Sequence, residues 1–173
     1  MLSSHEIRGK IKDRFEGFEK IYTDYSTLGS IWRHILVKET VDDYSEVYEI
    51  AIDFAKQGKL VRMLPILDSA HPLREQIFKG AKANKCPDLN VNDKYVDVKT
   101  PDPDPSLNAL DNNVKKGAKQ ANIVVIRVLG QVQHWIMERV VRCRSAKHSS
   151  LEQVIFKVIG KKTYVFDRRN FIR

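Results

Sequence analysis

The sequence predicts an α+β fold in which a helical N-terminal half precedes a β-β-α-β-α-β-β sheet region. Apolar residues recur at helical spacing over the first part of the chain. After residue 86 the spacing changes to the alternating and continuous apolar runs that are typical of strands. The length of 173 residues suits one compact domain, in which we distinguish a helical region at 1–58 and a sheet region at 59–173.

Three helices are predicted in the N-terminal region. The first covers residues 4–21, where apolar positions repeat at spacings of three and four. The second includes residues 31–36, which hold two pairs of apolar residues one helical turn apart. The third runs over residues 41–57, with Asp42 or Asp43 as its candidate N-cap.

The sheet region begins with a broken strand and continues with alternating elements. Residues 60–67 predict a strand that Pro65 interrupts, and residues 71–80 predict a short helix. The later elements are predicted from apolar pattern and turn residues, in the order strand 88–91, strand 94–100, helix 106–121, strand 122–128, helix 132–144, strand 151–160 and strand 162–167.

Composition argues against a membrane protein and against a disulfide-stabilised secreted one. No run of about 18 apolar residues occurs, so we expect no transmembrane helix and no membrane partner. The charged N-terminus lacks the apolar core of a signal peptide. Cys86 and Cys143 are the only cysteines, and their spacing fits no metal site. We therefore expect a cytoplasmic protein with reduced thiols.

The net charge of +8 is concentrated at the C-terminal end of the chain. From Arg139 to Arg173 there are ten Lys and Arg and only two acidic residues, whereas the preceding 138 residues hold 20 of each sign. Such a segment attracts polyanions, although a solvated basic surface is the alternative interpretation. The candidates for nucleic-acid binding lie in and after the last predicted helix and are Arg139, Arg142, Arg144, Lys147 and His148.

The segment "PDLNVNDKYVDVKT" predicts a β-hairpin that opposes two aspartates. Asn92 and Asp93 suit a two-residue turn because both residue types tolerate positive φ. With this turn, Asp88 lies opposite Asp97 on the polar face, which also carries Lys99. The other face holds only Leu and Val, and a shift by one residue would mix the two faces.

Two opposed carboxylates destabilise a hairpin unless their repulsion is relieved. A divalent cation, the ammonium of Lys99, or a shared proton with one raised pKa would relieve it. In an exposed hairpin, solvent screening would suffice and no site would be needed. Both interpretations stay open at this point.

Three further polar residues are candidates for contacts with a phosphate. Thr100 precedes Pro101, which holds it extended and leaves its hydroxyl available. Gln120 ends the helix before a buried strand and could bind a phosphate or the hairpin, or serve only as a helix-end residue. His148 lies in a polar basic turn where a free imidazole could act as an acid or a base, or remain an ordinary surface residue.

The order Pro-Asp, then Asp-x-Lys, with an upstream helical glutamate resembles the PD-(D/E)XK nucleases. This resemblance implies a Mg²⁺ site made by Asp88, Asp97 and either Glu49 or Glu46. Lys99 would position water or steady developing charge. The implied activity is metal-dependent cleavage of DNA.

A wider resemblance covers about residues 60–166. The segments "PDLNVNDKYVDVKTP", "NNVKKGAKQANIVVIRV" and "LEQVIFKVIGKKTYVF" look like the tRNase domain at the C-terminus of CdiA-type contact-dependent inhibition toxins, in the barnase–EndoU–colicin–RelE group of RNases. The resemblance implies a nuclease-like sheet region, no required cofactor, RNA (above all tRNA) as partner, and a cognate inhibitor or immunity protein. The catalytic residues that it implies are Asp88, Asp97, Lys99, Thr100 and Gln120.

Three functions follow as hypotheses. The first is a metal-independent endoribonuclease in which the ribose 2′-hydroxyl attacks the phosphate, Lys99 stabilises the transition state, and the aspartates orient Lys99. The second is the Mg²⁺-dependent nuclease of the PD-(D/E)XK type. The third is a non-catalytic nucleic-acid-binding accessory protein that keeps the basic face.

Overall fold

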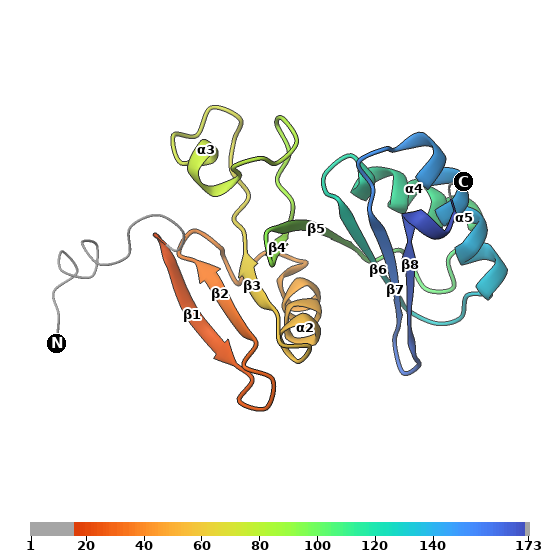
Figure 1. Cartoon of the computed structure of the whole chain (residues 1–173), viewed down its shortest axis with the longest axis horizontal. Coiled ribbons are helices and arrows are strands. Elements are labelled where there is room, and N and C mark those ends of the chain that lie inside the picture. Colours follow the sequence, from red (N-terminus) through yellow and green to blue (C-terminus); the bar gives the residue numbers. More distant parts are fainter. Residues whose placement is uncertain (1–15, 172–173) are drawn as a thin grey trace, which may run out of the picture.

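Eight strands form one mixed sheet through the part of the chain that this computed structural model describes, residues 16–171 (Figure 1). The strands follow one another in chain order: β1 (Phe18–Thr23), β2 (Ser30–His34), β3 (Leu60–Met63), β4 (Leu89–Val91), β5 (Lys94–Lys99), β6 (Ile123–Val128), β7 (Gln153–Val158) and β8 (Thr163–Asp167). The helices between and after them are α2 (Tyr44–Ala55), α3 (Arg74–Ile77), α4 (Leu107–Ala118), α5 (His134–Lys147) and the 3₁₀ helix η1 (Arg168–Asn170). Three neighbouring pairs, β2–β3, β5–β6 and β6–β7, are parallel, and the other pairs are antiparallel.

The predicted helical N-terminal half is wrong, because strands begin at residue 18. Of the first predicted helix, residues 18–21 lie in β1, and residues 4–15 lie outside the described part of the chain. Gly17 has a φ of 78°, a left-handed conformation that a right-handed helix does not contain. The segment that follows is rich in β-branched and aromatic residues, which favour strands.

The second predicted helix is a strand as well. Residues 30–34 form β2, in which Ile31 is fully buried and pairs with Val61 of β3. Ile35 and Leu36, which completed the apparent helical stripe, follow the strand and are exposed. Pairing with β1 and β3 decided the conformation here, and the short apolar pattern alone did not distinguish helix from strand.

The third predicted helix is confirmed as α2, and its buried stripe packs on the sheet. Asp43 occupies its N-cap position, but the Asp43 side chain makes no capping hydrogen bond. Strand β3 ends at Met63, two residues before Pro65, and the helix predicted over 71–80 is reduced to the four-residue α3.

The sheet has helices on both faces, and the alternation of side chains along the strands separates the two larger of its three apolar cores. On β6, Val125 joins the core beneath α2, whereas Val124 and Ile126 join the core beneath α4 and α5. On β5, Val96 and Val98 point towards α2. Asp97, which lies between them, therefore points towards the α4 side, so the predicted polar face of the hairpin is the face that α4 covers.

From β4 to β8 the predicted order of strands and helices is confirmed. These strands continue the sheet that begins at β1, so the fold is one mixed sheet with interspersed helices rather than a helical half followed by a sheet domain. The predicted boundary between the two regions, at residues 58 and 59, lies between the paired strands β2 and β3 in the chain. The division into two regions stays a prediction. Within residues 16–171, no helix has the length and apolar character needed to cross a bilayer.

Gly117 allows α4 to lie close to the sheet beside the polar face of β5. A Cβ atom at this position would lie 2.6 Å from a methyl group of Val124 and 3.1 Å from Oδ2 of Asp97. Both residues are fully buried, so neither has free space into which to move. Gly117 is therefore a packing residue within a helix, a position in which glycine otherwise lowers stability.

We expect Gly117→Ala to lower the free energy of unfolding by about 1–3 kcal/mol, because overpacking outweighs the better helix propensity of alanine. On the exposed face of the same helix, Asn112→Ala should raise it by a few tenths of a kcal/mol, since only propensity changes there. Urea denaturation of both variants measures the two changes. A Gly117→Ala protein as stable as the wild type would show that α4 does not need this close approach.

Candidate active site

The hairpin between β4 and β5 forms with the predicted turn. Asn92 and Asp93 have φ values of 46° and 67°, the left-handed pair that a two-residue turn requires. Val91 pairs with Lys94, as the sequence predicted. The apolar face of the hairpin is therefore the face that packs beneath α2.

Asp88 lies immediately before β4, which is shorter than β5. Its side chain lies beside the part of β5 that has no partner in β4. Its carboxylate Oδ2 accepts a hydrogen bond of 2.6 Å from the backbone N–H of Val98. Its own carbonyl oxygen accepts from the backbone N–H of Leu64 at 2.9 Å. The side chain thus replaces a backbone partner of β5 and is fixed at the edge of the hairpin.

Asp97 is fully buried, with 0% of its surface exposed. Its Oδ2 atom lies 2.7 Å from the ammonium nitrogen of Lys99, and this ion pair is partly shielded from solvent. Within the described residues, neither carboxylate oxygen of Asp97 has a hydrogen-bond partner of good geometry. The interpretation of an exposed hairpin screened by solvent is therefore wrong.

Burial raises the pKa of both aspartates. For Asp88, burial is the largest cause and the charge of Asp97 adds to it, so that the pKa of Asp88 rises to about 7. Lys99 and the Val98 N–H oppose this rise without cancelling it. Burial also raises the pKa of Asp97, against the attraction of Lys99. The repulsion between the carboxylates is thus relieved both by the ammonium group and by proton uptake near neutral pH.

Thr100 and one of the two candidate glutamates meet on the α2 side of the same strand end. The hydroxyl of Thr100 donates a hydrogen bond of 2.5 Å to Oε2 of Glu46. Glu49 instead pairs with Arg127 and Lys157, at 2.7 and 2.8 Å. Among residues 16–171, no group of three His, Cys, Asp or Glu side chains is arranged to hold a metal ion.

Residues 85–162 match the family model described as the contact-dependent growth inhibition CdiA C-terminal domain. This segment is similar to that family. The match contains the hairpin, α4, β6, α5 and the β7–β8 turn, and it confirms the resemblance to CdiA-type toxin domains. The similarity to this family supports a toxic, nuclease-type function in general terms only.

A solved structure is similar to most of this chain. It is a chain in the CdiA-CT/CdiI toxin and immunity complex from Burkholderia pseudomallei, and the similarity covers 76% of this chain and 92% of that chain. The TM-score is 0.48 and the sequence identity is 17%. No curated protein sequence matches the chain.

Gln120 also lies within residues 85–162, but it is not close to Asp88, Asp97 and Lys99. It follows the C-cap of α4 and precedes β6, whereas Thr100 follows the other end of β5. Since β5 and β6 are parallel, these two residues lie at opposite ends of the strand pair. The catalytic role of Gln120 stays a prediction, without support from its position.

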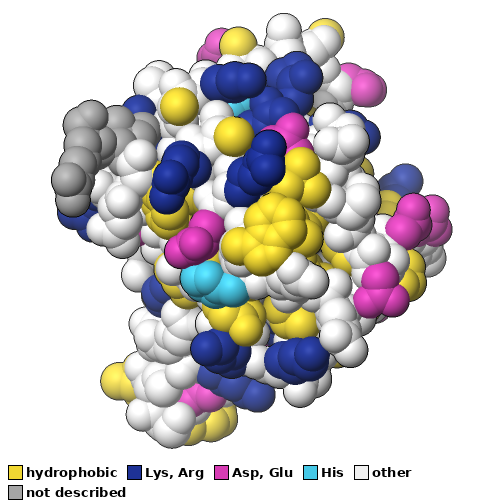
Figure 2. Space-filling model, turned by 90° about the vertical axis from the view of Figure 1, so that its right-hand side faces the viewer, with side chains coloured by type: hydrophobic (Ala, Val, Ile, Leu, Met, Phe, Trp, Pro, Cys, Tyr) yellow, Lys and Arg dark blue, Asp and Glu magenta, His cyan; other side chains and the backbone are white. Residues whose placement is uncertain are grey.

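The basic candidates lie on α5 and just after it. Arg139, Arg142 and Lys147 are exposed. Arg144 is buried and forms a bidentate ion pair with Asp111 of α4, so it holds the two helices together. Figure 2 views this side of the molecule and shows Lys and Arg side chains above and below a central hydrophobic patch, with acidic side chains among them.

His148 follows α5 in a strongly basic setting. Burial lowers its pKa, and the positive charges of Arg144, Lys82 and Lys119 lower it further. The lowered pKa favours the neutral form of the imidazole. It is not placed beside Lys99 by any contact, so its role as an acid or base stays a prediction.

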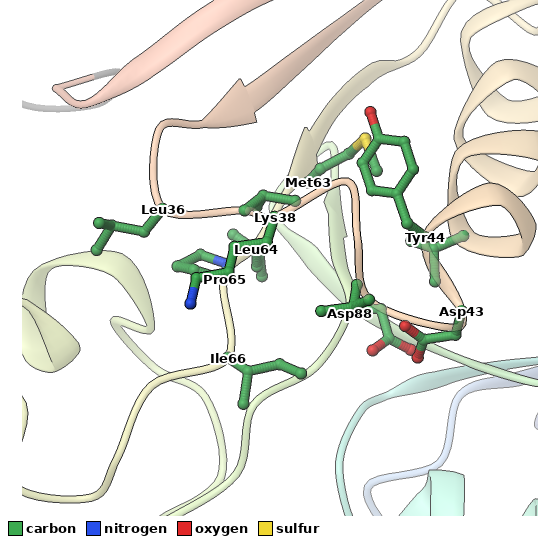
Figure 3. Close-up of a pocket in the computed structure, with 12 residues that line it drawn as sticks. Leu36, Lys38, Asp43, Tyr44, Met63, Leu64, Pro65, Ile66 and Asp88 are labelled. Carbon is green, nitrogen blue, oxygen red and sulfur yellow. The ribbon is translucent and has the colours of Figure 1, made fainter.

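Sequence reasoning missed Asp43 as a member of this site. The residue was assigned to helix capping, but its carboxylate makes no capping bond and lies beside the carboxylate of Asp88 (Figure 3). Its charge contributes to the raised pKa values of Asp88 and Asp97. No spacing rule links a helix start to a hairpin 45 residues later in the chain, because only the packing of α2 on the sheet brings them together.

The raised pKa of Asp88 predicts a specific pH dependence of stability. The folded protein keeps a proton that the unfolded chain releases near pH 4, so this group stabilises fully below that pH and loses its effect as pH rises to about 7. Asp88→Asn should therefore weaken the fall in unfolding free energy between pH 4 and 7, by on the order of 3 kcal/mol at most.

Urea denaturation at several pH values measures this difference between Asp88→Asn and the wild type. Asp42→Asn, which removes an exposed carboxyl group outside the pair, is the control and should follow the wild-type profile. Parallel profiles for Asp88→Asn and wild type would mean that Asp88 titrates normally and that the carboxylates are not coupled.

Proposed function

We propose that this chain is a nuclease that cleaves RNA phosphodiester bonds and that Asp88, Asp97 and Lys99 form its active site. The observation that carries the proposal is the arrangement of Lys99, whose ammonium lies 2.7 Å from buried Asp97 beside a carboxyl group with a pKa of about 7. A cation fixed in place stabilises developing phosphate charge, and a group that titrates near neutral pH can transfer protons. The family match of residues 85–162 supports this class of function.

In the proposed reaction, Asp88 removes the proton of the ribose 2′-hydroxyl, whose oxygen attacks the adjacent phosphorus. The bond from phosphorus to the 5′-oxygen breaks, and that oxygen takes up a proton from the carboxyl group or from water. The products are a 2′,3′-cyclic phosphate and a free 5′-hydroxyl. Lys99 stabilises the negative charge of the transition state, while Asp97 holds the ammonium group in position.

The proposed substrate is tRNA, in line with the sequence resemblance to CdiA-type tRNase domains. Exposed Arg139, Arg142 and Lys147 would bind the phosphate backbone, which is the sequence-independent part of RNA recognition. Arg144 is excluded from this set because Asp111 already neutralises it. A cognate inhibitor or immunity protein is part of the same proposal.

A second candidate is a cation-dependent hydrolysis, favoured by the carboxylate oxygens of Asp97 that lack hydrogen-bond partners among the described residues. Asp88 and Asp97 fit Mg²⁺, which is commonly held by one or two carboxylates together with water and substrate phosphate. When bound, Mg²⁺ would polarise the phosphate and activate water. Glu49 would not take part, because Arg127 and Lys157 already hold it.

Lys99 is the residue whose loss tests both candidates. We expect Lys99→Ala and Lys99→Met to reduce cleavage of tRNA by at least about 10²-fold, as loss of one transition-state donor does. Lys94→Ala is the matched control, because Lys94 lies on the same strand but pairs with Glu152 at the surface. Circular dichroism establishes that each variant is folded. Wild-type rates in both Lys99 variants would remove Lys99 from the mechanism.

The two chemistries differ in their requirements for metal and for the 2′-hydroxyl. The proposed RNase should cleave tRNA at an unchanged rate in excess EDTA and should fail on a substrate with a single 2′-deoxy substitution at the cut. A cation-dependent enzyme would lose activity in EDTA, cleave the 2′-deoxy substrate, and gain thermal stability from Mg²⁺, by about 2.7 kcal/mol at a hundredfold excess over Kd. Gel assays and thermal unfolding measure these outcomes, and binding without cleavage would leave only the accessory-protein hypothesis.

A further inference from the structure

A cavity of about 220 Å³ lies directly beside Asp88 (Figure 3). Its walls come from the loop after β2, the first turn of α2 and the chain that follows β3. Asp88 belongs both to the lining of this cavity and to the carboxylate pair. A molecule that filled the cavity would therefore be in contact with a group of the proposed active site.

The walls are mostly apolar, and apolar side chains also gather at the rim. Met63 and Val47 are buried in the walls, while Leu36, Val41 and Ile66 line the cavity with 40%, 36% and 76% of their surface exposed. Single exposed apolar side chains are ordinary, but three around one opening favour a binding surface. The cavity is smaller than the roughly 300–1,000 Å³ of pockets that bury drug-sized ligands, so it suits one planar ring system.

Two charged residues are placed at the opening of this apolar space. Asp43 has a carboxylate that makes no capping hydrogen bond and lies next to that of Asp88. Lys38 also lines the cavity, and its ammonium has no hydrogen bond or ion pair to another described residue. The opening thus offers a hydrogen-bond acceptor, Asp43, and a cation, Lys38, around an apolar interior.

We propose that this cavity binds one unstacked nucleobase of the strand being cut, next to the scissile phosphate; the proposal rests on the proposed nuclease function. The apolar walls would cover the faces of the ring, as in other sites for unstacked RNA bases. Asp43 would accept an N–H from the edge of the base, and Lys38 would pair with a flanking phosphate. Asp43 thereby becomes a specificity-determining residue that favours bases with N–H donors at that edge.

The position of the cavity relative to Lys99 favours a base over another apolar occupant. Asp88 lines the cavity and also interacts electrostatically with Lys99, so a base in the cavity would hold its own phosphate near the reacting groups. Unstacking a base from an RNA strand has a free-energy cost, which a preformed apolar cavity offsets. The cavity would therefore select single-stranded loops or ends, where bases are already unstacked.

The first test blocks the opening without touching the reacting groups. Ile66→Trp places an indole across the rim, and kcat/KM for tRNA cleavage should fall at least tenfold. Ile35→Trp is the matched control, because Ile35 is an exposed apolar residue that does not line the cavity. An Ile66→Trp enzyme with the wild-type kcat/KM would overturn the proposal and leave the nuclease function standing.

The second test concerns base preference. Short oligoribonucleotides copied from the mapped cut, with each of the four bases in turn at the adjoining nucleotide, should be cleaved at unequal rates by the wild type. Asp43→Asn should reduce this spread at least threefold, because an amide both donates and accepts, whereas Asp42→Asn should keep it. The ratio between bases is measured within one enzyme, so any change of the Asp88 pKa cancels. If the ratio of cleavage rates between the four bases is unchanged in Asp43→Asn, Asp43 does not determine the base preference.

The third test separates this proposal from the proposed function by using binding alone. Lys99→Ala protein with labelled methyl groups is titrated with pentanucleotides of each base and with an abasic pentamer. The methyl signals of Ile66 and Val41 should shift with base-bearing pentamers only, and that of Ile35 should not move. Such shifts, together with a wild-type protein that cleaves no RNA, would keep the base cavity and reject the nuclease. Absent shifts, or equal shifts with the abasic pentamer, would reject the base cavity.

Discussion

The burial of the Asp97 carboxylate beneath α4 is the constraint on which the rest of the site depends. A carboxylate with no exposed surface must be paired or protonated, because an isolated charge in such a place is strongly unfavourable. The ammonium of Lys99 supplies the pairing, and it is thereby fixed at one end of β5. The helix can cover this pair closely only because position 117 lacks a side chain. The position of the Lys99 ammonium therefore depends, through Asp97, on the close packing of α4 at Gly117.

The unequal lengths of β4 and β5 give the second carboxylate its place. Val98 needs a partner for its backbone N–H beyond the point where β4 has ended, and the side chain of Asp88 provides it. Burial is the main cause of the raised pKa of Asp88, and this bond brings Asp88 close enough to Asp97 for the charge of Asp97 to raise it further. Side chains of α2 reach the same strand end from the opposite face of the sheet, through the bond between Thr100 and Glu46. The site thus joins groups from both faces at a gap in the strand ladder.

The sequence was most informative where a local rule determined the outcome. The hairpin register followed from a two-residue turn and from one apolar face, so the amino-acid sequence alone was enough to group Asp88, Asp97 and Lys99. The N-terminal strands could not be found in this way, because Ile31 owes its conformation to β3, which lies 30 residues further along the chain. Gln120 looked suitable from its neighbours in sequence, but the parallel pairing of β5 and β6 places it at the far end of the strands. Asp43 and Glu46 were brought to the hairpin by the packing of α2, which no spacing pattern encodes.

The ion pairs on the α2 side restrict where a polyanion can bind. Arg127 and Lys157 project from the centre of the sheet, but Glu49 and Asp53 of α2 already neutralise them. Displacing those acids would cost the pairing of two partly buried cations, so a phosphate backbone gains more from cations at the surface. The cations without such partners include Lys38, at the mouth of the cavity, and the exposed residues of α5. A strand lying across the opening beside Asp88 would keep the α2 network intact, and it would bring the reacting phosphate to Lys99 without any change in the sheet.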